Sequence, residues 1–295
     1  MMHGISQLFR LHLVSIYSTN ACNSIKIYQI WQSKRGSSMQ RIAVITGATS
    51  GIGAAFAKML AAKGHDLFIT GRREKKLRSL SNELISRFGI SATVLLGDLG
   101  DPAVIGHLVE RISKLPFVDI LINNAGFGLD SLFLENVTKH DEMLSVHVVA
   151  ALSLMRAVLP GMISRGSGSI INVASVAGFL PVPRGATYSA TKSFLISVTE
   201  SVHMELAKSG IRTQALCPGL TVTDFHDREG SGGAEIRKSY PFKWMNPNKV
   251  VDISLRALGS NKVIVIPGLI NKLFVRCSPL IPRRLYYRLA EAARR

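Results

Sequence analysis

The stretch "YSATKSF", Tyr188–Phe194, carries two pairs of side chains that could do unrelated chemistry. Tyr188 and Lys192 are four residues apart, so on a helix the phenol and the ammonium lie on one face. Ser189 and Lys192 also form the S-x-x-K spacing, which is typical of serine nucleophiles. A third interpretation is a solvated helix start, because isolated Y-x-x-x-K pairs are common on exposed helices.

The tyrosine–lysine pair has the spacing that proton transfer to a carbonyl oxygen requires. A free tyrosine has a pKa of about 10, too high for reversible proton transfer near pH 7. An ammonium about 4 Å away, at an effective dielectric constant near 20, supplies roughly 4 kcal/mol. At about 1.36 kcal/mol per pKa unit, we expect Lys192 to lower the pKa of Tyr188 by about three units. The serine alternative lacks partners, since neither S-D-N nor K-T-G occurs in this chain.

A glycine-rich turn follows the first predicted strand and opens the first predicted helix. The glycines of "TGATSGIG", Thr46–Gly53, allow a tight turn and a close approach of backbone to phosphate. The helix N-terminus then offers N–H groups and a positive dipole end to a pyrophosphate. The spacing G-x-x-x-G-x-G differs from the general G-x-G-x-x-G fingerprint. We therefore predict a dinucleotide site that includes Gly47, Thr49, Ser50, Gly51, Ile52 and Gly53.

The end of the second strand predicts which dinucleotide binds. It reads "ITGRR", at the place where NAD-binding proteins carry a carboxylate for the ribose 2′-OH. Arg72 and Arg73 stand there instead, and a guanidinium suits a 2′-phosphate. An alternative is that both arginines only begin the solvated face of the next helix. We expect NADP(H), with Arg72 as its contact.

The elements that position these groups alternate regularly from Arg41 onward. Short β-branched runs indicate buried strands: "RIAVIT", "DLFIT", "ATVLLG", "VDILIN", "GSIINVA", "IRTQALC" and "KVIVIP". Helix-period segments lie between them, at Gly53–Lys63, Glu74–Arg87, Pro102–Lys114, His140–Ser164, Tyr188–Lys208 and Asn248–Leu258. This alternation predicts an α/β fold, a single Rossmann-like doubly wound parallel sheet of about seven strands with helices on both faces.

We place the NADP-binding catalytic domain at residues 40–268. One segment inside it and one at each end of it differ from the alternating pattern. Residues 1–39 contain scattered basic residues and no acidic ones. They are therefore either a targeting segment or a misassigned start upstream of Met39. Residues 224–248 turn polar and glycine-rich after a strand, which fits a lid or an ordinary insertion. Residues 269–295 form a basic amphipathic tail that could lie on an anionic membrane, cap the substrate cleft or pack in an oligomer.

The net charge of +17 favours anionic partners. No RNP, KH, zinc-finger or helix-turn-helix pattern accompanies it, so we do not expect nucleic-acid binding. No run of about 18 apolar residues occurs, and no transmembrane helix is expected. Three scattered cysteines without a CxxC pair indicate a reducing compartment and no metal site. We expect a cytoplasmic protein with peripheral membrane contact, or an organellar one if residues 1–39 are a transit peptide.

Five motifs together resemble the short-chain dehydrogenase/reductase family. They are "TGATSGIG", "NNAG" at Asn123–Gly126, Ser175 in "NVASVAG", "YSATK", and "PGLTVT" at Pro218–Thr223. Each is weak alone, but they stand in the family's order and spacing between about Arg41 and Pro267. The resemblance implies a Rossmann-like domain, a nicotinamide cofactor and a homodimer or homotetramer built on the long helices.

The resemblance also implies roles for single residues. Tyr188 is similar to the catalytic acid/base, and Lys192 to the lysine that holds the nicotinamide ribose and lowers the tyrosine pKa. Ser175 resembles the serine that hydrogen-bonds the substrate oxygen. Other positions match the cofactor pocket: Asp98 beside the adenine, Asn124 and Ala125 in the supporting motif with Asn123 and Gly126, Pro218, and Thr223 at the nicotinamide carboxamide.

One position departs from the family pattern. His147 stands about 28 residues before Ser175, where the family normally carries an asparagine whose backbone carbonyl holds a water on the lysine. Histidine can itself relay protons near its reference pKa of about 6.5. It could equally weaken the relay, or be a buried helix histidine with no part in turnover. We include His147 among the candidate catalytic residues.

These residues predict an NADP(H)-dependent oxidoreductase that interconverts a carbonyl and a primary or secondary alcohol. The hydride would come from nicotinamide and the proton from Tyr188. A lipophilic substrate is favoured if the basic tail contacts a membrane. The rival hypothesis is a non-catalytic NADP(H)-binding sensor or interaction protein, for which His147 is the best support.

Overall fold

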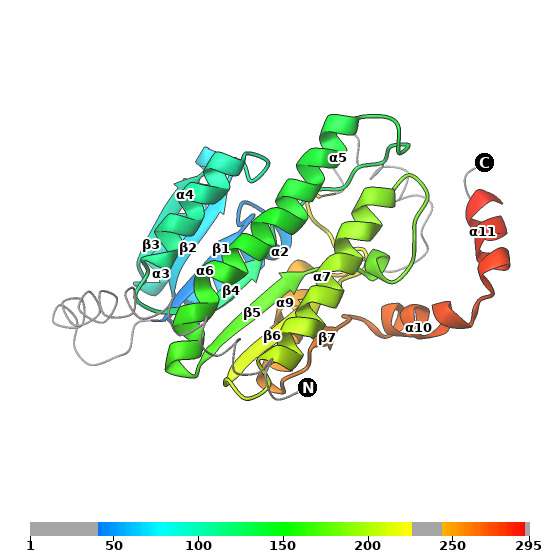
Figure 1. Cartoon of the computed structure of the whole chain (residues 1–295). Coiled ribbons are helices and arrows are strands. Elements are labelled where there is room, and N and C mark those ends of the chain that lie inside the picture. The colour runs from blue at the N-terminus through cyan, green and yellow to red at the C-terminus, as the bar shows by residue number, and fades with distance from the viewer. Residues whose placement is uncertain (1–40, 226–243, 293–295) are drawn as a thin grey trace, which may run out of the picture.

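The computed structural model describes residues 41–225 and 244–292 (Figure 1). The N-terminal extension predicted at residues 1–39 lies outside the described residues, as does most of the lid predicted at residues 224–248. The described parts of that lid are Asp224, Phe225 and the segment that begins at Trp244.

The described chain forms one parallel sheet of seven strands in the order β3-β2-β1-β4-β5-β6-β7. The strands are β1 (Ile42–Thr46), β2 (Asp66–Gly71), β3 (Ala92–Leu96), β4 (Val118–Asn123), β5 (Gly168–Val173), β6 (Ile211–Leu216) and β7 (Ile264–Val265). Six lie inside the predicted β-branched runs, and β2 extends one residue beyond its run "DLFIT", to Gly71. The doubly wound Rossmann-like fold is confirmed.

Alternate side chains of the strands pack into separate cores on the two faces of the sheet. In β1, Ala43 and Ile45 join one core, whereas Ile42 and Val44 join the other. Continuous apolar runs are therefore what this sheet requires, because helices cover both of its faces. The first core is covered by α2 (Gly51–Ala62), α3 (Glu74–Phe88) and α9 (Pro247–Gly259), and the second chiefly by α4 (Pro102–Ser113) and α6 (Ala150–Arg165).

One π-helical turn interrupts the long helix predicted at His140–Ser164. The helix runs through α5 (Val137–Leu144), η1 (Ser145–Val149) and α6. Its length and apolar composition would allow it to cross a membrane, but α6 packs against α4, β4 and β5 in the protein core. A core helix meets the same criteria, so this one is no argument for a membrane span. The π turn carries His147, and such turns are frequent at functional sites.

The strand order reverses between β1 and β4, which are neighbours in the sheet but not in the chain. Loops that leave two such strands diverge and open a crevice at their carboxyl ends, where ligands bind in open α/β sheets. Here β1 ends at Thr46, before the glycine-rich turn, and β4 ends at Asn123, the first residue of "NNAG". The next strand, β5, ends two residues before Ser175. The sheet therefore brings these motifs to one edge.

The C-terminal segment leaves the layered body. After β7, the elements α10 (Leu269–Cys277), η3 (Ser278–Leu280) and α11 (Arg283–Ala292) extend beyond the sheet (Figure 1). On α11, the Tyr286 hydroxyl donates a hydrogen bond back to the domain, to the Pro181 carbonyl. Pro181 belongs to the loop that precedes α7 (Ala186–Glu205).

Candidate active site

The glycine-rich turn leaves the N-terminus of α2 open to an anion. Gly47 and Gly51 have φ angles of 66° and 57°, which glycine adopts at little cost. Ser50, which precedes the helix, makes no side-chain cap hydrogen bond to the first turn. The N–H groups of that turn can therefore bind an external acceptor, and the residues present fit a pyrophosphate.

Thr46 joins this turn to the "NNAG" segment across the crevice. Its hydroxyl oxygen accepts hydrogen bonds from the backbone N–H groups of Asn124 at 3.0 Å and Ala125 at 2.9 Å. The Asn124 side-chain amide donates in return to the carbonyls of Thr46 and Gly47, at 3.0 and 3.1 Å. Sequence reasoning included Asn124 and Ala125 but missed Thr46, although it is the first residue of the glycine-rich motif.

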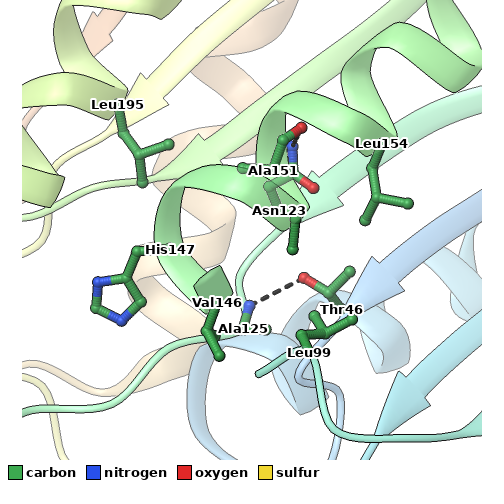
Figure 2. Close-up of a pocket in the computed structure, with 10 residues that line it drawn as sticks. Thr46, Leu99, Asn123, Ala125, Val146, His147, Ala151, Leu154 and Leu195 are labelled. Carbon is green, nitrogen blue, oxygen red and sulfur yellow. Dashed lines mark hydrogen bonds between the residues drawn. The ribbon is translucent and has the colours of Figure 1, made fainter. Parts of the chain in front are cut away.

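A small cavity of about 10 Å³ lies behind this junction (Figure 2). Asn123 lines it and donates through its amide to the Asn172 side chain at 2.9 Å and to the Ala151 carbonyl at 3.3 Å. Within the described part of the chain, the side-chain oxygen Oδ1 of Asn123 has no hydrogen-bond partner. A cavity of this size is close to the minimum that one water molecule needs. The "NNAG" asparagine therefore ties β4 to β5 and α6.

The two adjacent arginines after β2 point to different partners. Arg72 donates to the carboxylates of Asp98 at 2.9 Å and Glu142 at 3.2 Å. Arg73 donates to the hydroxyls of Thr49 at 2.8 Å and Ser50 at 2.6 Å, both in the glycine-rich turn. Sequence reasoning preferred Arg72 as the phosphate contact, but it is Arg73 that touches the turn.

Arg73 and Lys76 converge on one carboxylate, that of Asp224, at 2.8 and 3.0 Å. Hydrogen bonds from Arg73 and then Lys76 lower the pKa of Asp224 to about 2, so this side chain stays ionised. Two cations that hold an anion beside an open helix N-terminus are suited to a phosphate as well. Burial would raise the pKa of Asp98, but the Gly100 N–H and Arg72 outweigh it, and the pKa of Asp98 is lowered.

Ser175, Tyr188 and Lys192 meet at the carboxyl end of β5. Ser175 caps the short 3-10 helix η2 (Val176–Gly178), where its hydroxyl accepts from the Ala177 N–H at 3.1 Å, and it also hydrogen-bonds the Tyr188 side chain. Tyr188 and Lys192 lie one turn apart on α7. The Lys192 Nζ lies 5.6 Å from the centroid of the Tyr188 ring and donates to the Val173 carbonyl at 2.9 Å.

Burial dominates the protonation of this group. Burial raises the pKa of Tyr188 above its usual value, and the Ser175 hydrogen bond acts in the opposite direction. Burial also lowers the pKa of Lys192 to about 8. The expectation that Lys192 lowers the pKa of Tyr188 is therefore wrong for this arrangement. Desolvation of the tyrosinate is the largest effect on the pKa of Tyr188, and it acts against ionisation.

The geometry does not support a serine nucleophile at Ser189. Its hydroxyl donates to the Gly185 carbonyl at 2.9 Å and accepts from the Val182 N–H at 3.2 Å. These bonds hold the first turn of α7 on the preceding loop, while Lys192 bonds elsewhere. Ser189 is a structural neighbour of the site.

Both ring nitrogens of His147 are engaged inside the protein. Nε2 lies 3.1 Å from the Phe127 N–H and accepts from it, so Nδ1 carries the ring proton. Nδ1 lies 2.9 Å from the Thr191 hydroxyl, which in turn donates to the Tyr188 carbonyl at 2.9 Å. The ring also meets the Tyr188 ring edge-on, with centroids 5.9 Å apart. His147 therefore connects the loop after β4 to the turn of α7 that carries Tyr188.

His147 is neutral in this position. The residue is 1% exposed, and burial followed by the charge of Lys192 lowers its pKa well below 6.5. Gly126 leaves the space for the ring, because a Cβ there would lie 2.8 Å from the His147 Nε2. This geometry gives His147 the task of positioning Tyr188.

The remaining predicted cofactor residues line the same edge. Thr223 packs on the glycine-rich turn so closely that a Cβ on Gly51 would lie 2.7 Å from its methyl carbon. The Pro218 carbonyl accepts from the Val176 N–H at 3.1 Å, which joins the loop after β6 to the loop after β5. Ile52 is partly buried and packs against the first core.

The sheet is doubly wound and parallel, with a glycine-rich turn where the strand order reverses. A serine, a tyrosine and a lysine lie at the adjoining strand end. Together these features define the Rossmann-fold nicotinamide oxidoreductases. The chain belongs to the short chain dehydrogenase family, whose model matches residues 41–232.

Individual relatives agree with this assignment. The chain is 33% identical over 219 residues to an uncharacterized oxidoreductase of Staphylococcus epidermidis, a match that covers 72% of this chain and 94% of the relative. It is 31% identical over 231 residues to very-long-chain 3-oxoacyl-CoA reductase of Mus musculus, covering 75% and 72%. A solved short-chain dehydrogenase from Sphingobium yanoikuyae in complex with NADPH has a TM-score of 0.73 at 31% identity, covering 78% of this chain and 88% of that one.

The neutral state of His147 predicts a pH-dependent contribution to folding. The pKa of His147 is lowered in the folded state, so below about pH 6.5 the unfolded chain takes up a proton that the folded chain does not. Stability should therefore fall as the pH drops below about 6.5, by up to about 1.4 kcal/mol per pH unit from this residue. Urea unfolding at pH 5 and pH 7.5 should show a smaller difference for His147→Gln than for the wild type. An equal difference would contradict a buried neutral histidine.

Proposed function

We propose that the protein is an NADP(H)-dependent reductase that converts a lipophilic carbonyl compound to an alcohol. The observation that carries the proposal is the Ser175–Tyr188–Lys192 group, in which a protonated phenol lies beside a serine hydroxyl at the ligand edge of the sheet. The raised pKa of Tyr188 keeps the phenol protonated at neutral pH. A protonated phenol is the form that reduction needs.

Each residue of the group has a distinct task. Nicotinamide, when bound, supplies the hydride. Tyr188 donates its proton to the oxygen that becomes the alcohol. The Ser175 hydroxyl orients that oxygen and stabilises its developing charge. Lys192, with a pKa of about 8, is mostly an ammonium at pH 7 and offers a hydrogen-bond donor to the cofactor ribose.

The basic cluster beside the glycine-rich turn supports NADP(H) over NAD(H). Arg73 contacts the hydroxyls of Thr49 and Ser50, and Lys76 lies near enough to share Asp224 with it. Arg73 is therefore the better candidate for the 2′-phosphate, because Arg72 is held by two carboxylates. A guanidinium and an ammonium together match the charge of a phosphate monoester. The NADPH complex of the Sphingobium relative is consistent with this choice.

Aromatic rings around Tyr188 support a lipophilic substrate. The Phe225 ring lies 5.9 Å from the Tyr188 ring, and a Cβ on Gly128 would lie 3.1 Å from Phe225. The loops that frame this region are joined, because the Ser131 N–H donates to the Arg184 carbonyl at 3.1 Å. The mouse relative is named for a very-long-chain 3-oxoacyl-CoA, which is a ketone on a lipid chain. We infer the same broad class here, a ketone on an apolar chain.

The homodimer or homotetramer expected from the family belongs to the same proposal. Helices α6 and α7 carry exposed apolar side chains that an oligomer would cover, among them Ile163, Phe194 and Met204. The rival hypothesis of a non-catalytic NADP(H) sensor rested on His147. The hydrogen bonds of His147 hold the turn of α7 that carries Tyr188 in place. A histidine where the family carries asparagine therefore no longer favours a protein without turnover.

Replacing the proton donor tests the activity directly. Tyr188→Phe keeps the ring packing but removes the hydroxyl, so kcat for NADPH-dependent reduction of a panel of ketones should fall by about a hundredfold or more. Fluorescence titration should show NADPH binding like that of the wild type. An unchanged rate would exclude Tyr188 as the acid, and no turnover by the wild type across the panel would favour the sensor.

Removing each arginine in turn tests the cofactor contact. Arg73→Gln should weaken NADPH binding by about tenfold to a hundredfold, the usual effect of a lost charge-assisted hydrogen bond, and leave NADH binding unchanged. Arg72→Gln is the matched control, and it should change both dissociation constants by less than about threefold. If Arg72→Gln has the larger effect on NADPH, the contact is Arg72, as the sequence alone predicted. If neither variant discriminates between the cofactors, the preference for NADP(H) is wrong.

The pKa of Lys192 predicts the alkaline limb of the pH profile. Below about pH 8 the side chain is charged, and above it the ammonium that binds the ribose is lost. For reduction, kcat/KM should therefore decline above pH 8, because this ratio reports the groups of the free enzyme. In Lys192→Arg the cation persists to a pKa above about 12, so any remaining activity should lack that decline. A wild-type profile that is flat to pH 10 would contradict the assignment.

A further inference from the structure

The helix α10 presents an apolar face to solvent although its other side is already packed on the domain. Val275 is the buried apolar residue of α10, and Asn271, about one turn before it, donates to the Pro267 carbonyl at 2.7 Å. At 100° per residue these two side chains share one face of the helix. The exposed part of the helix carries four large apolar side chains whose exposed fractions run from 46% to 82%. Leu269 and Leu273 lie roughly opposite the buried face, and Ile270 and Phe274 lie between the two.

Basic side chains flank this apolar face and continue along the tail. Lys272 and Arg276 are four residues apart and border the face on α10, and both are exposed. On α11, Arg283, Arg284 and Arg288 are exposed beside the exposed Tyr287 and Leu285. No aspartate or glutamate occurs from residue 269 to residue 290. Within residues 41–225 and 244–292, none of these five cations forms an ion pair.

We propose that α10 and α11 form a docking surface for an anionic phospholipid bilayer. The exposed apolar side chains would enter the boundary between headgroups and acyl chains, and the arginines and lysine would reach the phosphates around them. Charge complementarity selects this occupant, because residues 269–292 hold five cations and a single acid, Glu291, and the chain carries a net charge of +17. The surface is thus built for peripheral contact.

The charge also argues against the other occupants. A second copy docked through the same face would place five cations and one acid, Glu291, against the same set, which leaves most of the charge unmatched. A nucleic acid would satisfy the charge but leave the exposed apolar side chains of α10 in water. A bilayer with anionic headgroups satisfies both halves of the surface.

The position of the surface connects it to the candidate active site. Tyr286 of α11 hydrogen-bonds the Pro181 carbonyl in the loop that precedes the helix of Tyr188. Figure 1 shows α10 and α11 on the outside of the layered body, away from the helices that cover the sheet. Docking through the tail would therefore bring this loop near the lipid. The proposal does not depend on the reductase activity, since the tail lies outside the catalytic group.

Vesicle sedimentation of the full chain tests the proposal. We expect the wild type to sediment with phosphatidylcholine–phosphatidylglycerol vesicles and to remain in solution with phosphatidylcholine vesicles. Arg283→Gln/Arg284→Gln/Arg288→Gln should lower the partition coefficient by roughly a hundredfold, since each cation contributes to binding of an anionic surface. Leu269→Ser/Leu273→Ser/Phe274→Ser should lower it by about tenfold or more, because the lost apolar area no longer inserts.

The matched control removes the same charge elsewhere. Lys75→Gln/Arg87→Gln/Arg111→Gln changes three exposed cations on α3 and α4, and it should keep most of the vesicle binding. Thermal unfolding of every variant shows whether the fold survives. If the tail variant with three glutamines unfolds, the variant with three serines on α10 still tests the proposal. Wild type that stays in solution, or a control that loses as much binding as the tail variants, would overturn the proposal. So would vesicle-independent dimers that only the tail variants abolish, because the occupant would then be a second copy.

Discussion

The hydrogen bonds that Thr46 accepts across the crevice between β1 and β4 are the constraint on which the rest of the site depends. One hydroxyl oxygen takes the N–H groups of Asn124 and Ala125, and Asn124 returns two bonds to the glycine-rich turn. In an open α/β sheet the loops diverge at this point. Without such bonds the positions of the glycine-rich turn and of the loop after β4 would be independent of each other. Because the two segments are joined, the position of the glycine-rich turn also fixes the loop after β4, which His147 contacts at the Phe127 N–H.

Desolvation is the second organising effect, and it acts on three neighbours at once. It keeps Tyr188 protonated, weakens the hold of Lys192 on its proton and leaves His147 neutral. A buried tyrosinate would be costly without a close cation, so the resting group is poised to give a proton. The hydrogen bonds from His147 through Thr191 to the Tyr188 backbone carbonyl connect the π turn to the turn of α7 that carries the phenol.

The C-terminal tail differs from the domain in how its apolar side chains are covered. Inside the sheet and its helices, large apolar side chains are covered from both sides, as in β1 and α6. On α10 the same residue types remain in water beside exposed cations. A folded chain retains such a face when a partner covers it, and the basic composition restricts the chemistry of that partner.

The sequence alone predicted the elements of the fold and named the candidate reacting groups. Short β-branched runs predicted all seven strands of the described sheet, and helix-period segments predicted the helices between them, because strands buried on both faces are apolar along their length. The spacing of Tyr188 and Lys192 placed both on one turn of a helix for the same local reason. Only the tertiary structure decided that Arg73 rather than Arg72 meets the turn, that a π turn directs His147 to Thr191, and that burial outweighs the lysine at Tyr188. Those outcomes depend on distances and desolvation between segments far apart in the chain, which no local pattern encodes.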